Sequence, residues 1–77
     1  MSRLKELRKK KKFTQIKIQM ETGIDQSNYS KIERGVKEIT YRECKALALL
    51  FDTSMDYLAE ITDIAEPYPR NNKKRLL

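Results

Sequence analysis

Apolar residues recur along most of this chain at the three- and four-residue spacing of an amphipathic helix, and short polar stretches separate the apolar runs. This pattern predicts an all-α protein. The predicted helices cover residues 3–10, 15–22, 26–34, 41–51 and 55–61. The fourth of these is the most apolar stretch of the chain, so we expect it to form the centre of the core.

Capping and turn-forming residues mark the ends of these helices. Side chains that can accept a hydrogen bond from a first-turn amide precede four of them, namely Thr14, Asp25, Thr40 and Ser54. Thr40 is followed three residues later by Glu43, which is the spacing of a capping box. Gly23 and Gly35 follow the second and third helices, as expected for a C-terminal residue with positive φ.

Residues 15–22 carry a competing periodicity. Ile16, Ile18 and Met20 alternate with polar residues, which on its own is typical of a strand. The segment is short, however, and it lies between a capping threonine and a glycine. We therefore predict a helix for this segment.

The most informative unit is the pair of helices at residues 15–22 and 26–34, which are joined by a short turn containing Gly23. This arrangement is typical of a helix-turn-helix, whose second helix enters the major groove of DNA. One face of the helix at 26–34 is polar, partly basic and free of carboxylates, with Gln26, Ser27, Asn28, Ser30, Lys31 and Arg34. Glutamine and asparagine can bond an adenine edge and lysine a guanine edge, whereas a carboxylate would be repelled by phosphate.

The charge distribution supports a polyanionic partner. The 77-residue chain has a formal charge of +6, with +7 in residues 1–20, −4 in residues 41–66 and +4 in residues 67–77. This asymmetry indicates one face for a polyanion and another for a different partner. A domain of this length buries a small core and is marginal alone, so we also expect an oligomer.

The composition excludes most kinds of catalytic and metal site. The chain has no histidine, one cysteine (Cys44) and two glycines. Histidine-dependent nucleophiles, histidine-containing or cysteine-rich zinc sites and glycine-rich phosphate loops are therefore ruled out. Carboxylates remain but nothing indicates catalysis, so we expect no enzymatic activity and no cofactor. A lone cysteine fits a cytoplasmic setting, and no apolar stretch approaches the ~20 residues of a membrane span.

Six short stretches form a combination that is characteristic of one family. They read R-L-K-E-L-R at 3–8, T-Q at 14–15, G-I-D-Q-S at 23–27, Y-S-K-I-E-R-G at 29–35, T-Y at 40–41 and S-M-D-Y-L at 54–58. With them, residues 3–61 resemble the Cro-like phage-repressor family of helix-turn-helix domains, also called the xenobiotic-response-element type. The resemblance implies a five-helix lambda-repressor-like bundle with the helix-turn-helix as its second and third helices. It also implies binding of double-stranded operator DNA by a two-fold dimer, and most relatives are repressors.

The resemblance also assigns roles to individual side chains. The residues that would read bases, or lie beside those that do, are Gln26, Ser27, Lys31, Asn28 and Ser30. Gln15 and the first backbone amides of the second helix would bind phosphate. We expect further phosphate contacts from Thr14, Lys11, Lys17, Arg34 and Lys37. Arg8 and Glu33 occupy positions that form a buried ion pair in relatives, linking the first and third helices.

Two residues depart from the family pattern. Gln19 stands where relatives usually have alanine, and Thr22 stands where they usually have leucine. Both reduce the apolar face of the second helix, so we expect looser packing of the two helices at Gln19. A different rotation of the second helix, burying Ile16, Ile18 and Met20, would compensate.

The remaining apolar residues divide between the core and a partner face. We expect Cys44 in the core, and four aromatic residues in the core or at its edge, namely Tyr29, Tyr41, Phe51 and Tyr57. An apolar strip in the acidic half of the chain is the expected dimer face, with Met55, Leu58, Ile61 and Ile64. The domain is expected to cover residues 1–62, followed by an extended, partly mobile, proline-containing basic tail at 63–77.

The leading hypothesis is thus a dimeric transcriptional regulator, most simply a repressor, that binds an inverted repeat. Two alternatives stay open. One is a protein-interaction module of the same fold, such as the antitoxin of a toxin–antitoxin pair, whose protein partner the sequence does not name. The other is a basic protein that binds any polyanion through residues 3–12. Leu4 and Leu7 give that segment too little apolar area for firm membrane attachment, so no membrane partner is expected.

Overall fold

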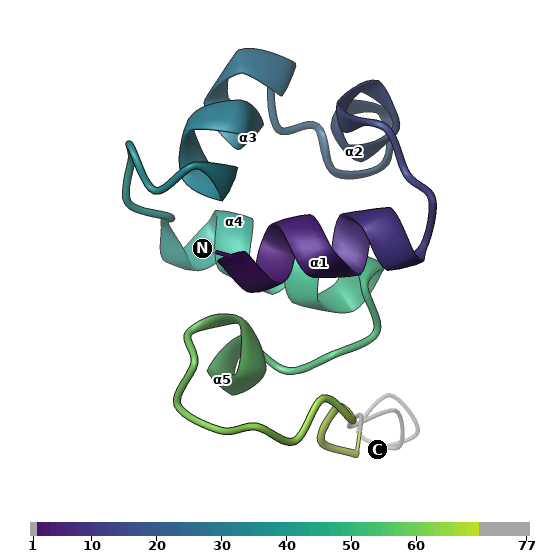
Figure 1. The fold of residues 1–77 in the computed structure, drawn as a ribbon, viewed down its shortest axis with the longest axis vertical. Coiled ribbons are helices and arrows are strands. Elements are labelled where there is room, and N and C mark those ends of the chain that lie inside the picture. Colours follow the sequence, from purple (N-terminus) through teal and green to yellow (C-terminus); the bar gives the residue numbers. More distant parts are fainter. Residues whose placement is uncertain (1, 70–77) are drawn as a thin grey trace, which may run out of the picture.

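The computed structural model describes residues 2–69 and contains five helices and no strand within that range. The helices are α1 (Ser2–Lys10), α2 (Gln15–Thr22), α3 (Gln26–Glu33), α4 (Tyr41–Leu50) and α5 (Met55–Leu58). Helix α2 packs against α3 and α4, α1 packs against α3, and α5 packs against α4. Figure 1 shows the α2–α3 pair at one end of the molecule and α5, with the segment after it, at the other. The predicted all-α class is confirmed.

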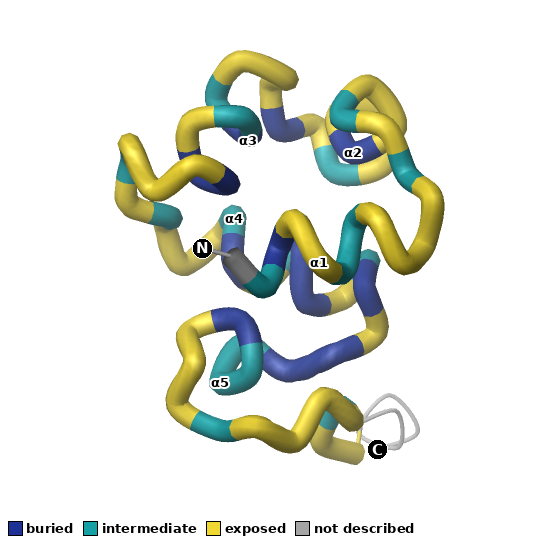
Figure 2. Tube along the Cα trace, viewed as in Figure 1, coloured by how far each residue is buried: buried dark blue, intermediate teal, exposed yellow. Residues whose placement is uncertain are grey.

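A single hydrophobic core joins the helices. Its fully buried large side chains come from all five helices, namely Leu4, Ile18, Tyr29, Ile32, Leu47 and Leu58. Cys44 is also buried in this core, as predicted. Burying a side chain of this kind stabilises the fold by about 1.5–3 kcal/mol. Figure 2 shows that the buried positions lie where the helices face one another. Among residues 2–69, no helix has the length and apolar character needed to cross a membrane.

The predicted core aromatic residues divide into two groups. Tyr29 and Phe51 are buried, and Tyr57 is half-buried. Tyr41, however, is 71% exposed, so the prediction for this residue was wrong. Tyr41 is the first residue of α4, and the buried positions of that helix begin one turn later at Cys44.

Helix α5 is shorter than the sequence predicted. It ends at Leu58, whereas the apolar spacing extended the predicted helix to Ile61. The chain leaves the helix because Glu60 adopts a φ of +64°, and the Ile61 N–H donates to the carbonyl of Asp56 at 2.9 Å. This pairing is a Schellman motif, which ends a helix and turns the chain away from its axis. The apolar spacing therefore continues beyond the residues that are helical.

Two other helices end in the same way without a glycine. Lys12 follows α1 with a φ of +59°, and Asp52 follows α4 with a φ of +55°. In each case the next N–H donates back into the helix, and the one after Lys12 reaches the Arg8 carbonyl at 2.9 Å. A non-glycine residue in this conformation costs roughly 1–2 kcal/mol. Because no glycine marks these positions, these helix ends are hard to predict from the sequence.

Arg3 fastens the start of α1 to the end of α5. Its guanidinium donates to the backbone carbonyls of Tyr57 at 2.7 Å and Thr62 at 2.6 Å, and it pairs with the carboxylate of Asp63. It also lies 4.2 Å from the centre of the Tyr57 ring. Arg3 was counted with the basic residues expected to attract a polyanion, but its charge is used inside the fold.

The segment after α5 lies against the helices. The Thr53 hydroxyl donates to the Ala65 carbonyl at 2.6 Å, and the Tyr68 hydroxyl donates to Asp56 at 2.6 Å. The first part of the segment predicted to be an extended, partly mobile tail thus contacts the domain through Ala65 and Tyr68. The rest of the predicted tail, residues 70–77, lies outside the described residues.

Candidate nucleic-acid interface

The turn between α2 and α3 is built from a capping side chain and a glycine. At the start of α2 the Thr14 hydroxyl accepts a hydrogen bond from the Lys17 N–H at 3.0 Å. At its end Gly23 has a φ of +78°, and its N–H donates to the Gln19 carbonyl at 2.8 Å. A Cβ at Gly23 would meet no atom within 4 Å. Glycine is therefore favoured there by its backbone conformation and not by lack of space.

Thr22 braces this turn with its hydroxyl. The hydroxyl donates to the Ile18 carbonyl at 2.7 Å and accepts from the Ile24 N–H at 3.1 Å. A leucine, which is usual in relatives, could make neither bond. Compared with leucine, threonine at position 22 thus has less apolar area to pack but adds two hydrogen bonds to the turn.

Helix α2 is not rotated to bury its other apolar residues. Ile18 is fully buried, but Ile16 is 49% exposed and Met20 is 74% exposed. The compensating rotation suggested by the sequence was therefore wrong. Ile16 and Met20 are four residues apart and share one face of the helix, whereas Ile18 lies on the opposite face, so the helix cannot bury all three against one core.

Gln19 joins α2 to the start of α3. Its side-chain Oε1 accepts a hydrogen bond from the backbone N–H of Gln26 at 2.7 Å. Gln26 is the first residue of α3, and the first N–H groups of a helix have no partner within it. The two helices are thus connected at the position where the sequence predicted looser packing.

Asp25 completes the cap of α3. Its Oδ2 accepts hydrogen bonds from the backbone N–H groups of Ser27 at 3.0 Å and Asn28 at 3.3 Å. Together with the bond from Gln26 to Gln19, three consecutive amides of the first turn have a side-chain partner. The N-terminal turn of α3 is therefore fixed before any ligand binds.

Arg8 and Glu33 form a bidentate ion pair between α1 and α3. Arg8 Nε donates to Glu33 Oε2 at 2.8 Å, and its Nη2 donates to Oε1 at 3.1 Å. The same carboxylate accepts from the Tyr29 hydroxyl at 2.7 Å and from Gln15 Nε2 at 3.4 Å. Glu33 thus holds α3 against α1 and against the first residue of α2. Gln15, an expected phosphate contact, is partly engaged in this cluster.

The contacts of Glu33 set the charge of the cluster. Burial acts to raise the pKa of Glu33, but the hydrogen bonds from Arg8 and Tyr29 outweigh it and hold the pKa below its ordinary value. The hydrogen bond to Glu33 raises the pKa of Arg8. Burial and the neighbouring carboxylate raise the pKa of Tyr29. At neutral pH the cluster therefore holds one carboxylate, one guanidinium and a neutral phenol.

The residues expected to read bases do not share one environment. Three of them are exposed on α3, namely Gln26, Ser27 and Lys31. Ser30 is half-buried. Asn28 is also half-buried, and its Nδ2 donates to Glu43 Oε2 at 2.7 Å. The three exposed residues are available to a ligand, whereas Asn28 connects α3 to α4.

Glu43, in the first turn of α4, accepts hydrogen bonds from α3, from the loop after α3 and from the residue that caps α4. Its carboxylate accepts from the Thr40 N–H at 2.9 Å, from the Asn28 amide, and from Lys37 Nζ at 3.4 Å. Burial acts to raise the pKa of Glu43, but the hydrogen bonds from Thr40 and Asn28 and the charge of Lys37 lower it overall. The sequence predicted the Thr40–Glu43 capping box, which the structure contains. It gave no sign of the two longer-range contacts.

The expected phosphate contacts lie on several elements and differ in the partners that they already have. Lys11 is exposed, and Lys17 pairs with Glu21 at 3.1 Å on the surface of α2. Arg34 Nε donates to the Ser30 carbonyl at 3.3 Å. Surface ion pairs of this kind are worth about 0–1 kcal/mol, so a phosphate can replace the carboxylate partner of such a lysine at little cost.

The expected dimer strip is smaller than predicted. Leu58 is fully buried in the core, so its assignment to that strip was wrong, and Met55 is half-buried against the core. Ile61 and Ile64 are 74% and 65% exposed. Within the predicted strip, the exposed apolar area therefore lies after α5, at these two isoleucines.

Comparison with known proteins agrees with this geometry. The helix-turn-helix domain family matches residues 1–64. A Bacillus subtilis (strain 168) protein named "Uncharacterized HTH-type transcriptional regulator YobD" is 35% identical over 74 residues, or 96% of this chain. The chain spans 64% of that relative's length. No solved structure matches the chain. With α2 and α3 forming the helix-turn-helix, the chain belongs to the helix-turn-helix domain family.

Proposed function

We propose that this chain is a sequence-specific double-stranded DNA-binding transcriptional regulator, and that it represses as a homodimer on an inverted-repeat operator. The proposed activity is binding and not catalysis. The name of the Bacillus subtilis relative, an HTH-type transcriptional regulator, supports the regulatory part of this proposal.

The main support for the proposal is that α3 exposes polar side chains while its backbone is held in place by other contacts. Its exposed residues Gln26, Ser27 and Lys31 include donors and acceptors but no carboxylate. The helix behind them is held by Glu33 and by the cap at Asp25. A reading surface that is already ordered loses little conformational entropy on binding, which favours affinity and specificity. Lys31 suits a guanine edge and Gln26 an adenine edge.

The dimer part rests on the acidic segment at residues 41–66. Ile61 and Ile64 are exposed there, on the segment that Arg3 fastens through Thr62 and Asp63. A second copy placed on this face would present two α3 helices to one side of a duplex. Half-sites would then lie about one helical turn apart, ~34 Å, or a multiple of that distance.

Selection of bound sequences from a random duplex library tests the proposal. The selection is run with the full chain at about 0.15 M salt with random DNA as competitor, because electrostatic binding alone weakens steeply with salt. We expect enrichment of an inverted repeat. The Gln26→Ala variant should relax the preference at one position of each half-site, at a cost of roughly 1–3 kcal/mol.

Two results would contradict the proposal. One is the absence of any enriched sequence, with binding that disappears as salt rises, which would leave only a polyanion-binding protein. The other is an unchanged sequence preference when Gln26 and Ser27 are both replaced by alanine, since α3 would then not be the reading helix. Enrichment of a single half-site would retain DNA recognition and reject the dimer.

A further inference from the structure

A cavity of about 470 Å³ lies between α1, the turn after α4 and the segment after α5. No residue of α2 or α3 lines it. Its volume falls within the ~300–1,000 Å³ of small-molecule sites. The cavity is therefore large enough for a ligand, and of the side chains assigned to DNA only Lys11 lines it.

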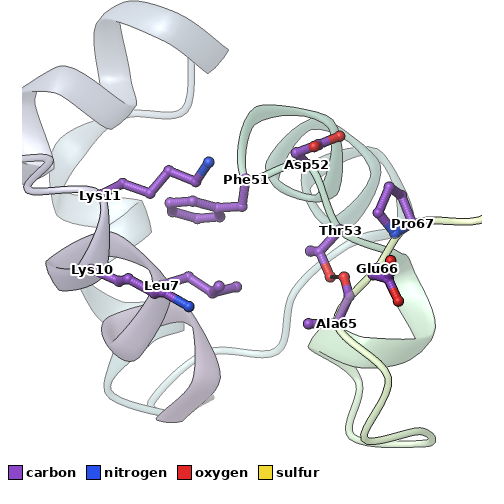
Figure 3. A pocket seen from close by; sticks show the side chains of 9 residues that line it. All are labelled: Leu7, Lys10, Lys11, Phe51, Asp52, Thr53, Ala65, Glu66 and Pro67. Atoms are coloured by element: carbon purple, nitrogen blue, oxygen red, sulfur yellow. Dashed lines mark hydrogen bonds between the residues drawn. The ribbon is translucent and has the colours of Figure 1, made fainter.

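The cavity has an apolar floor and a fixed outer wall. Leu7 from α1 and Phe51 from the end of α4 lie together on one side, and Figure 3 shows Ala65 facing Leu7 across the gap. The wall that contains Ala65 is fastened by the hydrogen bond from the Thr53 hydroxyl to the Ala65 carbonyl at 2.6 Å. The groove is open to solvent on one side, and an apolar group can pack between α1 and this segment.

The charges around the cavity are arranged by sign. Figure 3 shows the side chains of Lys10 and Lys11 extending from the end of α1 toward the gap, Lys11 beside Phe51 and Lys10 beside Leu7. The carboxylates of Asp52 and Glu66 point away from the gap on the other side. A ligand on the floor therefore meets two positive charges and no inward-pointing negative charge from the lining residues.

We propose that this cavity binds a small amphipathic carboxylate, an aryl or alkyl acid with a single negative charge. The carboxylate pairs with Lys10 and Lys11, and the apolar body packs on Leu7 and Phe51. Both parts are needed, because an exposed ion pair alone contributes little affinity and the burial of apolar area must supply the rest. A cationic ligand of the same shape would be repelled by the two lysines.

Occupation of the cavity also affects the proposed DNA interface, and this consequence rests on the proposed function. Lys11 is one of the expected phosphate contacts, and it lies just before α2. A carboxylate that neutralises Lys11 removes one cation from the DNA contact. Bound acid should then weaken DNA binding and reduce the slope of log affinity against log salt by about 0.9.

Titration of the full chain with 2-naphthoate, followed by amide chemical shifts in the absence of DNA, tests the cavity itself. We expect saturable shifts at Leu7, Phe51 and Ala65. Replacing Lys10 and Lys11 together by glutamine should weaken binding about fivefold or more. The matched control is Lys9→Gln, since Lys9 is exposed on α1 but does not line the cavity. This variant should bind 2-naphthoate with the affinity of the wild type.

A second variant tests the apolar half of the site without changing charge. Ala65→Leu fills the space opposite Leu7 and should weaken 2-naphthoate binding, while the amide spectrum shows that the fold is retained. The proposal is overturned if no saturable shift occurs at the cavity residues, or if Lys9→Gln weakens binding as much as the double variant. Because these titrations contain no DNA, their failure leaves the proposed DNA-binding function untouched, and failure of DNA selection leaves the cavity result standing.

Discussion

The side-chain oxygen of Gln19 in α2 accepts a hydrogen bond from the backbone N–H of Gln26, the first residue of α3, at 2.7 Å. One helix of the helix-turn-helix thus caps the other. The contact fixes the backbone of the residue that we propose reads DNA, so the two helices move as one unit.

Replacing Gln19 by alanine, the usual residue of relatives, should destabilise this protein by about 1 kcal/mol. The reason is that the Gln26 N–H loses its acceptor at the start of a helix. Gln19→Glu keeps an acceptor and places a negative charge near the positive end of α3, so it should retain the stability. Urea unfolding of the three proteins measures the difference, and equal midpoints for all three would show that the cap contributes nothing.

Breaking the Arg8–Glu33 pair from one side should be far more costly. Arg8→Met leaves the buried Glu33 carboxylate without its guanidinium, and we expect a loss of about 3–5 kcal/mol, measured by thermal unfolding. Adding Glu33→Gln to this variant removes the unpaired charge and keeps an acceptor for Tyr29. The double variant should therefore be more stable than Arg8→Met alone. If it were less stable, the cost would come from lost packing and not from the uncompensated charge.

Acid should unfold this protein partly through Glu33 and Glu43. Both carboxyl groups have a folded-state pKa below the ordinary value, and burial opposes that shift while hydrogen bonds and neighbouring charges produce it. The unfolded chain then binds more protons, so this contribution to stability is complete above the unfolded pKa of ~4.3 and is lost as the pH falls through the folded pKa values.

Urea unfolding at a series of pH values from about 3 to 7 measures this effect, since stability tracks the difference in bound protons. Glu33→Gln should flatten the dependence in the acid range. Glu38→Gln serves as the control, because Glu38 is exposed and should leave the curve unchanged apart from its vertical position. An identical acid dependence in the Glu33 variant and the wild type would show that other carboxylates control the transition.

Glycine at position 60 should stabilise the domain by roughly 1 kcal/mol, because Glu60 has a φ of +64° that a side chain disfavours. The neighbouring residue provides the control. Ala59 has a helical φ of −81°, so Ala59→Gly should be destabilising. The reverse change, Gly23→Ala, should also destabilise despite the open space around it, since its φ is +78°. Thermal midpoints that rise for Ala59→Gly and fall for Glu60→Gly would reject this account.

Two neighbouring residues of α3 should differ in what their substitution changes. Gln26→Ala should leave the unfolding midpoint unchanged and alter the preferred DNA sequence, because its side chain is exposed. Asn28→Ala should lower the midpoint, since it removes the 2.7 Å bond to Glu43 and costs about 1 kcal/mol. Unfolding and library selection on both variants separate the two roles. A changed base preference with unchanged stability in Asn28→Ala would return this residue to the reading surface.

Features that act within one or two helical turns could be predicted from the order of residues alone. Thr14, Asp25, Thr40 and Ser54 cap the helices that they were predicted to cap, because a capping side chain bonds an amide two or three residues away. Gly23 was recognisable because the positive φ after α2 favours a residue without a Cβ. These contacts are local, so the order of residue types is enough to predict them.

Which side chains are used in the interior and which stay exposed depends on how the helices pack. Glu43 reaches Asn28, fifteen residues away, and Arg3 reaches Thr62, fifty-nine residues away. Leu58 and Ile61 continue one apolar spacing, yet the first is buried and the second exposed. Such outcomes depend on where other helices lie, since burial and long-range hydrogen bonds arise only when elements pack. The sequence specified the helices of this protein, and their packing selected the side chains available to a partner.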